Sequence, residues 1–386
     1  MNIPFNKPYM TGRENDYIRQ AVEIGKISGN GVFTKKCQSF FENRYGFKKC
    51  LLTTSCTDAL EMAAILAKVG PGDEVIVPSY TFVSSALAFV RTGAKIVFAD
   101  SRADQPNIAA AQLESLITPR TKVIVPVHYA GVACDMDAIM DVANRHNLLV
   151  VEDAAQAIDS FYTGRDGVRR PLGSIGHLAA FSFHETKNII SGEGGLLVVN
   201  DERFVRRAEI IWEKGTNRAE FFRGEVNKYG WVDTGSSFLP SEIVAAFLWA
   251  QLENLDAIQH RRKQIWNHYC EALKPIAERG AFRLPIIPEY ATNNAHMFYL
   301  LFPDLAKRTE FIAQMKALDV MCVFHYLALH DSEFYRGKHD GRPLPNCDHY
   351  ADCLVRLPLY YELDPESVLE GIRNIYNLQH GTEAVL

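Results

Sequence analysis

The chain has 386 residues, of which 47% are hydrophobic and 23% are charged, a composition typical of a globular protein with a large core. Its formal net charge of -5 argues against the strongly basic surface that nucleic-acid binding requires. The N-terminus lacks the apolar core of a signal peptide and no apolar run reaches transmembrane length, so we expect a cytoplasmic protein.

The first 240 residues predict alternating helices and strands. A capping-box pattern from Thr11 to Glu14 begins a first helix, and a second helix follows from about Thr34. A short strand from Cys50 meets small hydroxyl residues, which begin a helix at about Asp58. Further strands are predicted over 74–78, 95–99, 123–127, 148–151, 178–183 and 196–199, with helices over 83–90, 108–117 and 136–146 between them.

These strands are nearly continuous in apolar residues, which indicates an α/β fold with a mostly parallel sheet covered on both faces. In such sheets ligands bind outside the carboxyl ends of the strands. The polar residues that directly follow the predicted strands are therefore candidates, and they occupy positions 79–82, 128–129, 153–156 and 184–187.

The pattern changes after about residue 240. A dense apolar helix is predicted over 243–255, and a last helix begins at Asp364-Pro365. Between them we predict strands over 282–287, 297–302 and 320–325 and a helix over 309–318. The chain thus predicts a large α/β domain over residues 1–250 and a smaller α+β domain over residues 251–386.

Three features of the large domain suggest a pyridoxal phosphate (PLP) site. Lys187 follows a strand and could bind the cofactor's aldehyde, while Asp153 follows another strand and could keep the pyridine nitrogen protonated. Ser55-Cys56-Thr57 begins a helix whose free backbone N–H groups could bind the phosphate, and Phe82 could stack on the ring. Simpler readings stay open: a surface lysine, an Asp that caps a helix, an ordinary capping box with Asp58, and a core phenylalanine.

The eight cysteines are scattered, with no Cys-x-x-Cys pair and no cysteine–histidine cluster at zinc spacing. This distribution favours reduced thiols over a disulfide framework, and we expect no metal site.

Several segments resemble the DegT/DnrJ/EryC1/StrS family in order and spacing: 72–82, 150–156, Phe-Ser-Phe-His-Glu-Thr-Lys-Asn at 181–188, and 192–195. The resemblance runs from Ile3 to Leu359. It implies fold type I, the aspartate-aminotransferase-like fold, with a large mostly parallel sheet domain and a smaller α+β C-terminal domain. It also implies PLP as cofactor and transfer of an amino group to a nucleotide sugar.

The resemblance implies a role for each matching residue. Lys187 would form the Schiff base and transfer protons, and Asp153 would contact the pyridine nitrogen. The remaining cofactor contacts would come from Cys56, Thr57, Phe82, Gln156, Ser182 and Ser237. Two of these depart from the family pattern, since Cys56 replaces a glycine and Ser237 replaces an asparagine that reaches the neighbouring subunit's phosphate.

Local stretches at 126–133, 213–224, 294–299 and 324–326 resemble the family members of the enterobacterial antigen pathway. They imply L-glutamate as amino donor and dTDP-4-keto-6-deoxyglucose as the ketone aminated at C4 to the galacto product. The family resemblance implies a homodimer with its site between subunits. Substrate contacts would come from Lys214, Arg218, Arg223, His296, Tyr299, His325 and Tyr326. A solvated charged loop and ordinary core histidines and tyrosines remain alternatives for these residues.

Competing functions differ in chemistry. The same reaction on the other face of the sugar would give the 4-amino-4,6-dideoxyglucose epimer. A PLP-dependent deoxysugar dehydratase would replace the lysine by histidine or add an iron–sulfur site, whereas this chain keeps Lys187 and has no cysteine cluster. A non-catalytic ligand-binding regulator would carry an added helix-turn-helix or basic segment, which the sequence does not show.

Overall fold

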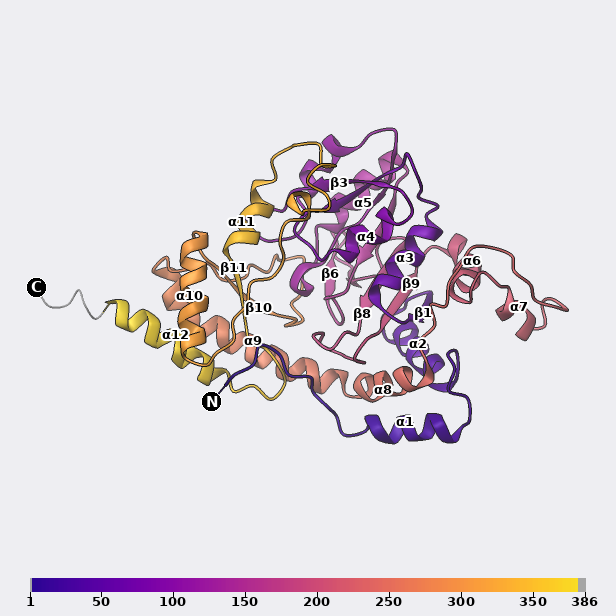
Figure 1. The fold of residues 1–386 in the computed structure, drawn as a ribbon, viewed down its shortest axis with the longest axis horizontal. Helices are drawn as coiled ribbons and strands as arrows, with labels where there is room; N and C mark the ends of the chain where they lie inside the picture. The colour runs from indigo at the N-terminus through magenta and orange to yellow at the C-terminus, as the bar shows by residue number, and fades with distance from the viewer. Residues whose placement is uncertain (1, 381–386) are drawn as a thin grey trace, which may run out of the picture.

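The computed structural model describes residues 2–380, and a seven-stranded sheet lies at its centre (Figure 1). The strands are β1 (Lys49–Thr53), β2 (Glu74–Pro78), β3 (Lys95–Ala99), β4 (Thr121–Ile124), β5 (Leu149–Asp153), β8 (Leu178–Ser182) and β9 (Gly195–Val199). Their spatial order is β1-β9-β8-β5-β4-β2-β3, and β9 runs antiparallel to both of its neighbours while the other pairs are parallel. The predicted mostly parallel sheet is therefore confirmed.

Helices cover both faces of this sheet because successive strand residues point to opposite sides. In β5, Val150 packs into one apolar cluster and Val151 into the other. The first cluster includes residues of α1 (Glu14–Glu23), α2 (Val32–Tyr45), α5 (Met136–His146) and α8 (Glu242–Glu253). The second includes residues of α3 (Cys56–Leu66), α4 (Ser84–Val90) and α6 (Glu202–Trp212).

The C-terminal third packs around a third apolar cluster, in which Tyr269, Phe298 and Leu369 are fully buried. The elements of this third of the chain are α9 (Leu255–Glu278), β10 (Phe298–Leu301), α10 (Leu305–Ala317), α11 (Pro345–Cys353), β11 (Leu354–Leu357) and α12 (Pro365–His380), with β10 and β11 paired antiparallel. The buried residues of α11 pack into the second cluster. The predicted domain boundary at residue 250 falls inside α8, and the division into two domains stays a prediction.

Some predicted elements are wrong. The structure describes all of 282–287 and 320–325, and it has isolated bridges there in place of strands. Pro285 removes a backbone donor from the first segment, which disfavours a ladder. The helix predicted over 108–117 is a 3-10 helix, Ala110–Leu116.

Other elements were not predicted at all. The longest helix, α9, follows α8 directly, and polar residues interrupt its apolar face. A short hairpin of β6 (Phe161–Thr163) and β7 (Arg169–Pro171) was also missed, as were α6, α11 and β11. The structure also has 3-10 turns at Tyr129–Gly131 and Leu329–Asp331.

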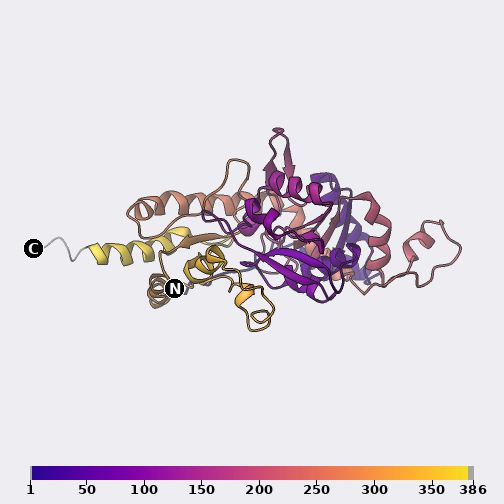
Figure 2. The ribbon, with the colours of Figure 1, turned by 90° about the horizontal axis from the view of Figure 1, so that it is seen from above.

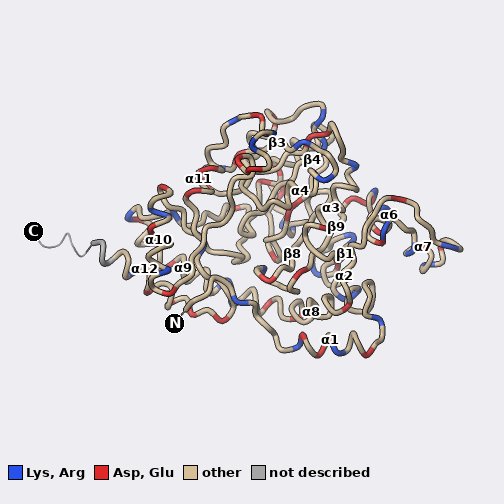
Figure 3. The backbone as a smooth tube through the Cα atoms, in the orientation of Figure 1, with Lys and Arg blue, Asp and Glu red and all other residues tan. Residues whose placement is uncertain are grey.

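Residues 213–237, between α6 and α8, form an arm that carries α7 (Arg218–Phe222). This arm projects away from the sheet in both views (Figures 1 and 2). Positive and negative residues are interspersed over the arm and the body (Figure 3). None of the helices described between residues 2 and 380 is long and apolar enough to cross a membrane.

Candidate active site

A cavity of about 550 Å³ opens where β2, β5 and β8 end. Strand-end residues and the start of α3 line it, as the rule for parallel sheets predicts. The structure brings these sequence-predicted residues together in its wall: Cys56, Thr57, Phe82, Asp153, Gln156, Ser182, Lys187, His296, His325 and Tyr326.

The start of α3 offers an anion-binding end. Ser55 is the N-cap and its hydroxyl accepts from Asp58 N at 3.0 Å, so the ordinary capping role is real. Cys56 and Thr57 occupy the first two helical positions, whose N–H groups have no partner within the helix. A Cβ on Gly195 would overlap the backbone of Ser55 and Cys56, so only glycine lets β9 approach this turn.

Asp153 is a buried carboxylate at the end of β5. Its Oδ2 accepts from Ser85 Oγ at 2.6 Å, and its Oδ1 accepts from Ala155 N at 3.1 Å. Burial raises the pKa of Asp153, although these two hydrogen bonds and the nearby Lys187 oppose the rise. A buried carboxylate is stabilised by a cation, and a protonated pyridine nitrogen would supply one.

Lys187 lies in the loop after β8, where its backbone N donates to His184 O at 2.9 Å. Burial lowers the pKa of Lys187 below its ordinary 10.5, and the positive charge of Arg356 acts in the same direction. Cys56 and Asp153 oppose this shift. A lower pKa increases the fraction of neutral amine, which is the nucleophilic form.

Gln156, Tyr326 and His325 line the cavity and are connected to one another and to Tyr129. Gln156 Oε1 accepts from Ala130 N at 2.6 Å, which directs its Nε2 to the Tyr326 hydroxyl at 3.0 Å. The His325 ring stacks on Tyr326 with centroids 3.5 Å apart, and its Nδ1 lies 2.7 Å from the Tyr129 hydroxyl. Burial holds the pKa of His325 well below 6.5, so its ring is neutral at pH 7.

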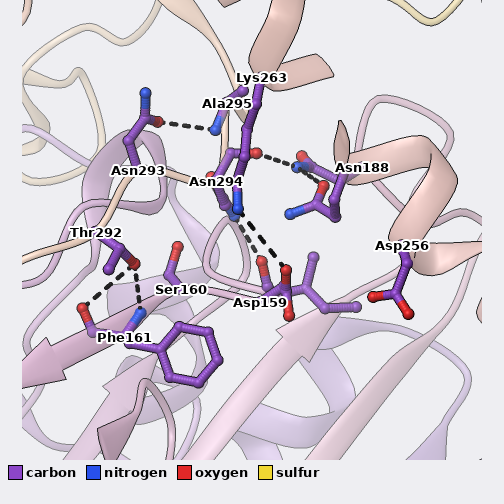
Figure 4. A network of polar contacts seen from close by, with 12 residues as sticks. Asp159, Ser160, Phe161, Asn188, Asp256, Lys263, Thr292, Asn293, Asn294 and Ala295 are labelled. Atoms are coloured by element: carbon purple, nitrogen blue, oxygen red, sulfur yellow. Dashed lines mark hydrogen bonds and ion pairs between the residues drawn. The ribbon is translucent and has the colours of Figure 1, made fainter. Parts of the chain in front are cut away.

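A polar network ties His296 to the loop that carries Lys187. Figure 4 shows its central contact, between Asn188 and Asn294. Asn294 Nδ2 donates to the carbonyl of Gln156 at 2.8 Å. Asn188 Nδ2 donates to the carbonyl of Asn294 at 2.9 Å, while its Oδ1 lies 2.9 Å from His296 Nδ1. These hydrogen bonds fix residues 294–296 of the C-terminal unit against the loop that carries Lys187.

The remaining predicted site residues do not line the cavity in the described chain. Arg223 is held on the arm by ion pairs to Glu209 at 2.9 Å and to Glu225 at 2.7 Å. The others are Lys214, Arg218 and Ser237, which are exposed on the segment between α6 and α8, and Tyr299 of β10.

Tyr299 is buried in the wall of the C-terminal unit. Its ring centroid lies 6.0 Å from that of Tyr129, which in turn contacts His325. It can support the cavity wall through Tyr129, and a direct contact with substrate stays a prediction.

Sequence reasoning missed cavity residues from both ends of the chain. Phe5 and Asn6 line the cavity from the N-terminal segment, and Arg356 lines it from β11. A usable signal for Arg356 was a charge within the apolar stretch from Leu354 to Leu359.

These residues fit pyridoxal phosphate. The α3 start supplies donors for a phosphate, Asp153 supplies a buried carboxylate for the ring nitrogen, and Lys187 supplies an amine of lowered pKa. When bound, the cofactor supplies an electron sink for bonds at the substrate's amino-bearing carbon.

The lowered pKa of Lys187 predicts how the apoenzyme captures PLP. The capture rate should rise with pH as the Lys187 amine loses its proton, with a midpoint below 10.5. Stopped-flow absorbance of apoenzyme mixed with PLP across a pH series measures this midpoint. Lys263→Ala, which removes a half-exposed lysine near Asp159, should leave the profile unchanged. A midpoint at or above 10.5 would contradict the burial argument.

The chain is similar to known proteins over most of its length. The model of the DegT/DnrJ/EryC1/StrS aminotransferase family matches residues 8–375. Spore coat polysaccharide biosynthesis protein SpsC of Bacillus subtilis (strain 168) is 33% identical over 386 aligned residues, covering 97% of each chain. GDP-perosamine synthase of Caulobacter vibrioides is 34% identical over 325 residues, covering 82% of this chain and 83% of that relative.

Solved structures of other proteins match the fold over nearly the whole chain. Spr1654 from Streptococcus pneumoniae, described as a sugar aminotransferase, matches in its PMP form with a TM-score of 0.89 at 26% identity, covering 98% of this chain and 100% of that one. It is also solved in a PLP form. DesV from S. venezuelae matches with a TM-score of 0.86 at 28% identity, covering 100% of both chains. The chain therefore belongs to the DegT/DnrJ/EryC1/StrS aminotransferase family and is a pyridoxal phosphate-dependent sugar aminotransferase.

Proposed function

We propose that the enzyme transfers an amino group from L-glutamate to C4 of dTDP-4-keto-6-deoxyglucose and forms the 4-amino-4,6-dideoxygalactose nucleotide. The observation that carries the aminotransferase chemistry is that Lys187, Asp153 and the α3 start line one cavity. A nucleotide sugar as acceptor is supported by the relative named GDP-perosamine synthase. The choice of dTDP and of the galacto product rests on the local sequence resemblances at 126–133, 213–224, 294–299 and 324–326.

The residues of the chain divide the work. Lys187 holds the cofactor between turnovers and moves a proton at the substrate carbon. Asp153 keeps the ring nitrogen protonated through its negative charge. His296, His325 and Tyr326 present neutral polar groups on the wall where the sugar would lie.

We further propose a homodimer in which each arm completes the partner's site. Lys214 and Arg218 are exposed and do not reach the cavity of their own chain. Phe222 and Trp231 on the same arm are 69% and 84% exposed, an apolar surface that a second copy could cover. Phe82 is 56% exposed at the cavity mouth, so the site is open on the side where a partner would lie. In this arrangement Ser237 would act across the interface.

Product NMR tests the proposed reaction. The holoenzyme is incubated with L-glutamate and dTDP-4-keto-6-deoxyglucose, and the proton couplings at C4 of the product are read. An axial amine, as in the galacto sugar, should give a small coupling to H3. Large couplings to both neighbours would show an equatorial amine and establish the gluco epimer instead. A deoxygenated sugar without nitrogen would establish the dehydratase alternative.

A further inference from the structure

Arg356 is a cation of the cavity wall that the cofactor contacts leave unused. We propose that Arg356, with Phe5 stacked against it, binds a carboxylate of the amino-donor amino acid and of the keto acid formed from it. The inference rests on the proposed donor chemistry and deepens it by naming a donor-binding residue.

The hydrogen bonding of Arg356 is incomplete. A guanidinium carries five N–H donors. The structure pairs Nη2 with Phe324 O at 3.2 Å, and Nε is buried with no hydrogen-bond partner. Nη1 makes no hydrogen bond to the described residues and is not buried, so it is the donor that an acceptor entering the cavity can reach.

The charge of Arg356 is also uncompensated. Within residues 2–380 no carboxylate lies within ion-pair distance of it. The ionisable groups that affect its pKa are the phenols of Tyr80, Tyr129 and Tyr326, all raised in pKa by burial and therefore neutral at pH 7. Arg356 is partly buried, and a partly buried cation without a counter-ion is stabilised when an anion enters the cavity.

The N-terminal segment positions this cation. Ile3 N donates to Asp319 O at 2.8 Å, which anchors the segment on the C-terminal unit. Asn6 Nδ2 donates to Glu185 O at 3.2 Å, close to Lys187 in the chain. Between these anchors the Arg356 guanidinium lies 4.5 Å from the centroid of the Phe5 ring. The guanidinium carbon lies over the Phe5 ring, a cation–π arrangement that helps to hold the side chain in the cavity wall.

A carboxylate matches this arrangement better than a phosphate. The cofactor phosphate has the donors of the α3 start on another wall. A sugar nucleotide's diphosphate carries two charged groups, whereas Arg356 provides one fork, which pairs bidentately with one carboxylate. Arg356 and Lys187 line the same cavity, so an anion bound by Arg356 shares that cavity with the amine that handles the donor's carbon.

The two half-reactions separate donor binding from sugar binding. In Arg356→Gln we expect kcat/KM for conversion of the PLP form by L-glutamate to fall about 100-fold, since charged hydrogen bonds are lost. Amination of the keto sugar by the PMP form should change by less than about threefold. Arg356→Lys keeps the charge without the fork and should lie between these limits. Stopped-flow absorbance measures each half-reaction.

A binding readout independent of turnover completes the test. Glutarate, an unreactive dicarboxylate, should bind wild-type holoenzyme by titration calorimetry and bind Arg356→Gln at least tenfold more weakly. The matched control is Arg308→Gln, which changes a partly exposed arginine of the same unit that donates to Asp352 O and does not line the cavity; it should bind glutarate as the wild type does. Phe5→Leu should weaken glutarate by a smaller factor.

Two outcomes would overturn the inference. Equal losses in both half-reactions would assign Arg356 to the diphosphate or to the fold, and unchanged glutarate binding would remove it from donor recognition. Failure of the proposed function looks different, because wild-type enzyme would then not convert with L-glutamate even though glutarate binding still depended on Arg356.

Discussion

Lys187→Ala is expected to abolish transamination, with turnover reduced by at least about 10⁴-fold, because one amine serves both as the cofactor's attachment point and as the proton-transfer group. The visible absorption of the lysine-bound cofactor should disappear together with activity. The apoenzyme should remain folded, since the substitution removes an amine whose pKa burial already lowers. Absorbance spectra, product formation and thermal unfolding of the apoenzyme measure these three effects.

Two comparisons make the Lys187 experiment specific. Lys263→Ala removes a half-exposed lysine that lies 4.0 Å from Asp159, and it should keep full activity and the normal spectrum. Lys187→Arg retains a positive charge but offers no amine that forms a Schiff base, so it should be as inactive as the alanine variant. Undiminished transamination in Lys187→Ala would contradict the assignment of Lys187 as the lysine that binds the cofactor.

The cofactor side of the site was predictable because its residues follow strands whose apolar pattern is unambiguous. Asp153 is the last residue of β5 and Lys187 follows β8, and the geometry of a parallel sheet brings such positions to one edge. The helix start at Ser55 was equally clear, because small hydroxyl residues at an N-cap are a local signal.

The substrate side was harder because it depends on contacts between distant segments. Phe5 and Arg356 are in contact although they are far apart in sequence, and no local sequence pattern predicts this contact. The strand predicted over 320–325 failed for a similar reason, since its backbone pairs with Ile3 at one bridge and Arg356 at another. The sequence shows that the arm carries cations, but it does not show that these cations lie outside the cavity lining of their own chain.

Asp153→Asn is expected to lower turnover by about 100-fold to 10⁴-fold while the protein still binds PLP, because the amide cannot supply the negative charge that holds the ring nitrogen protonated. The fold should tolerate the change. The amide oxygen can still accept from Ala155 N, and the Ser85 hydroxyl can accept where it now donates. Ser85→Ala, which leaves the carboxylate but removes one of its donors, should cause a smaller loss.

The same substitution should stabilise the apoenzyme at neutral pH. Burial raises the folded-state pKa of Asp153 above 3.8, so the unfolded chain releases this proton more readily than the folded one. Stability is therefore lost as pH rises from 3.8, the ordinary pKa, to the raised pKa of the folded state. Asparagine has no proton to release and avoids this loss, so the Tm of apo Asp153→Asn should exceed that of the wild type at pH 7. The difference should shrink toward acid pH, where Asp153 is itself neutral. A lower Tm at pH 7 would show that the carboxylate contributes to folding, and the activity loss would then no longer isolate its role toward the cofactor.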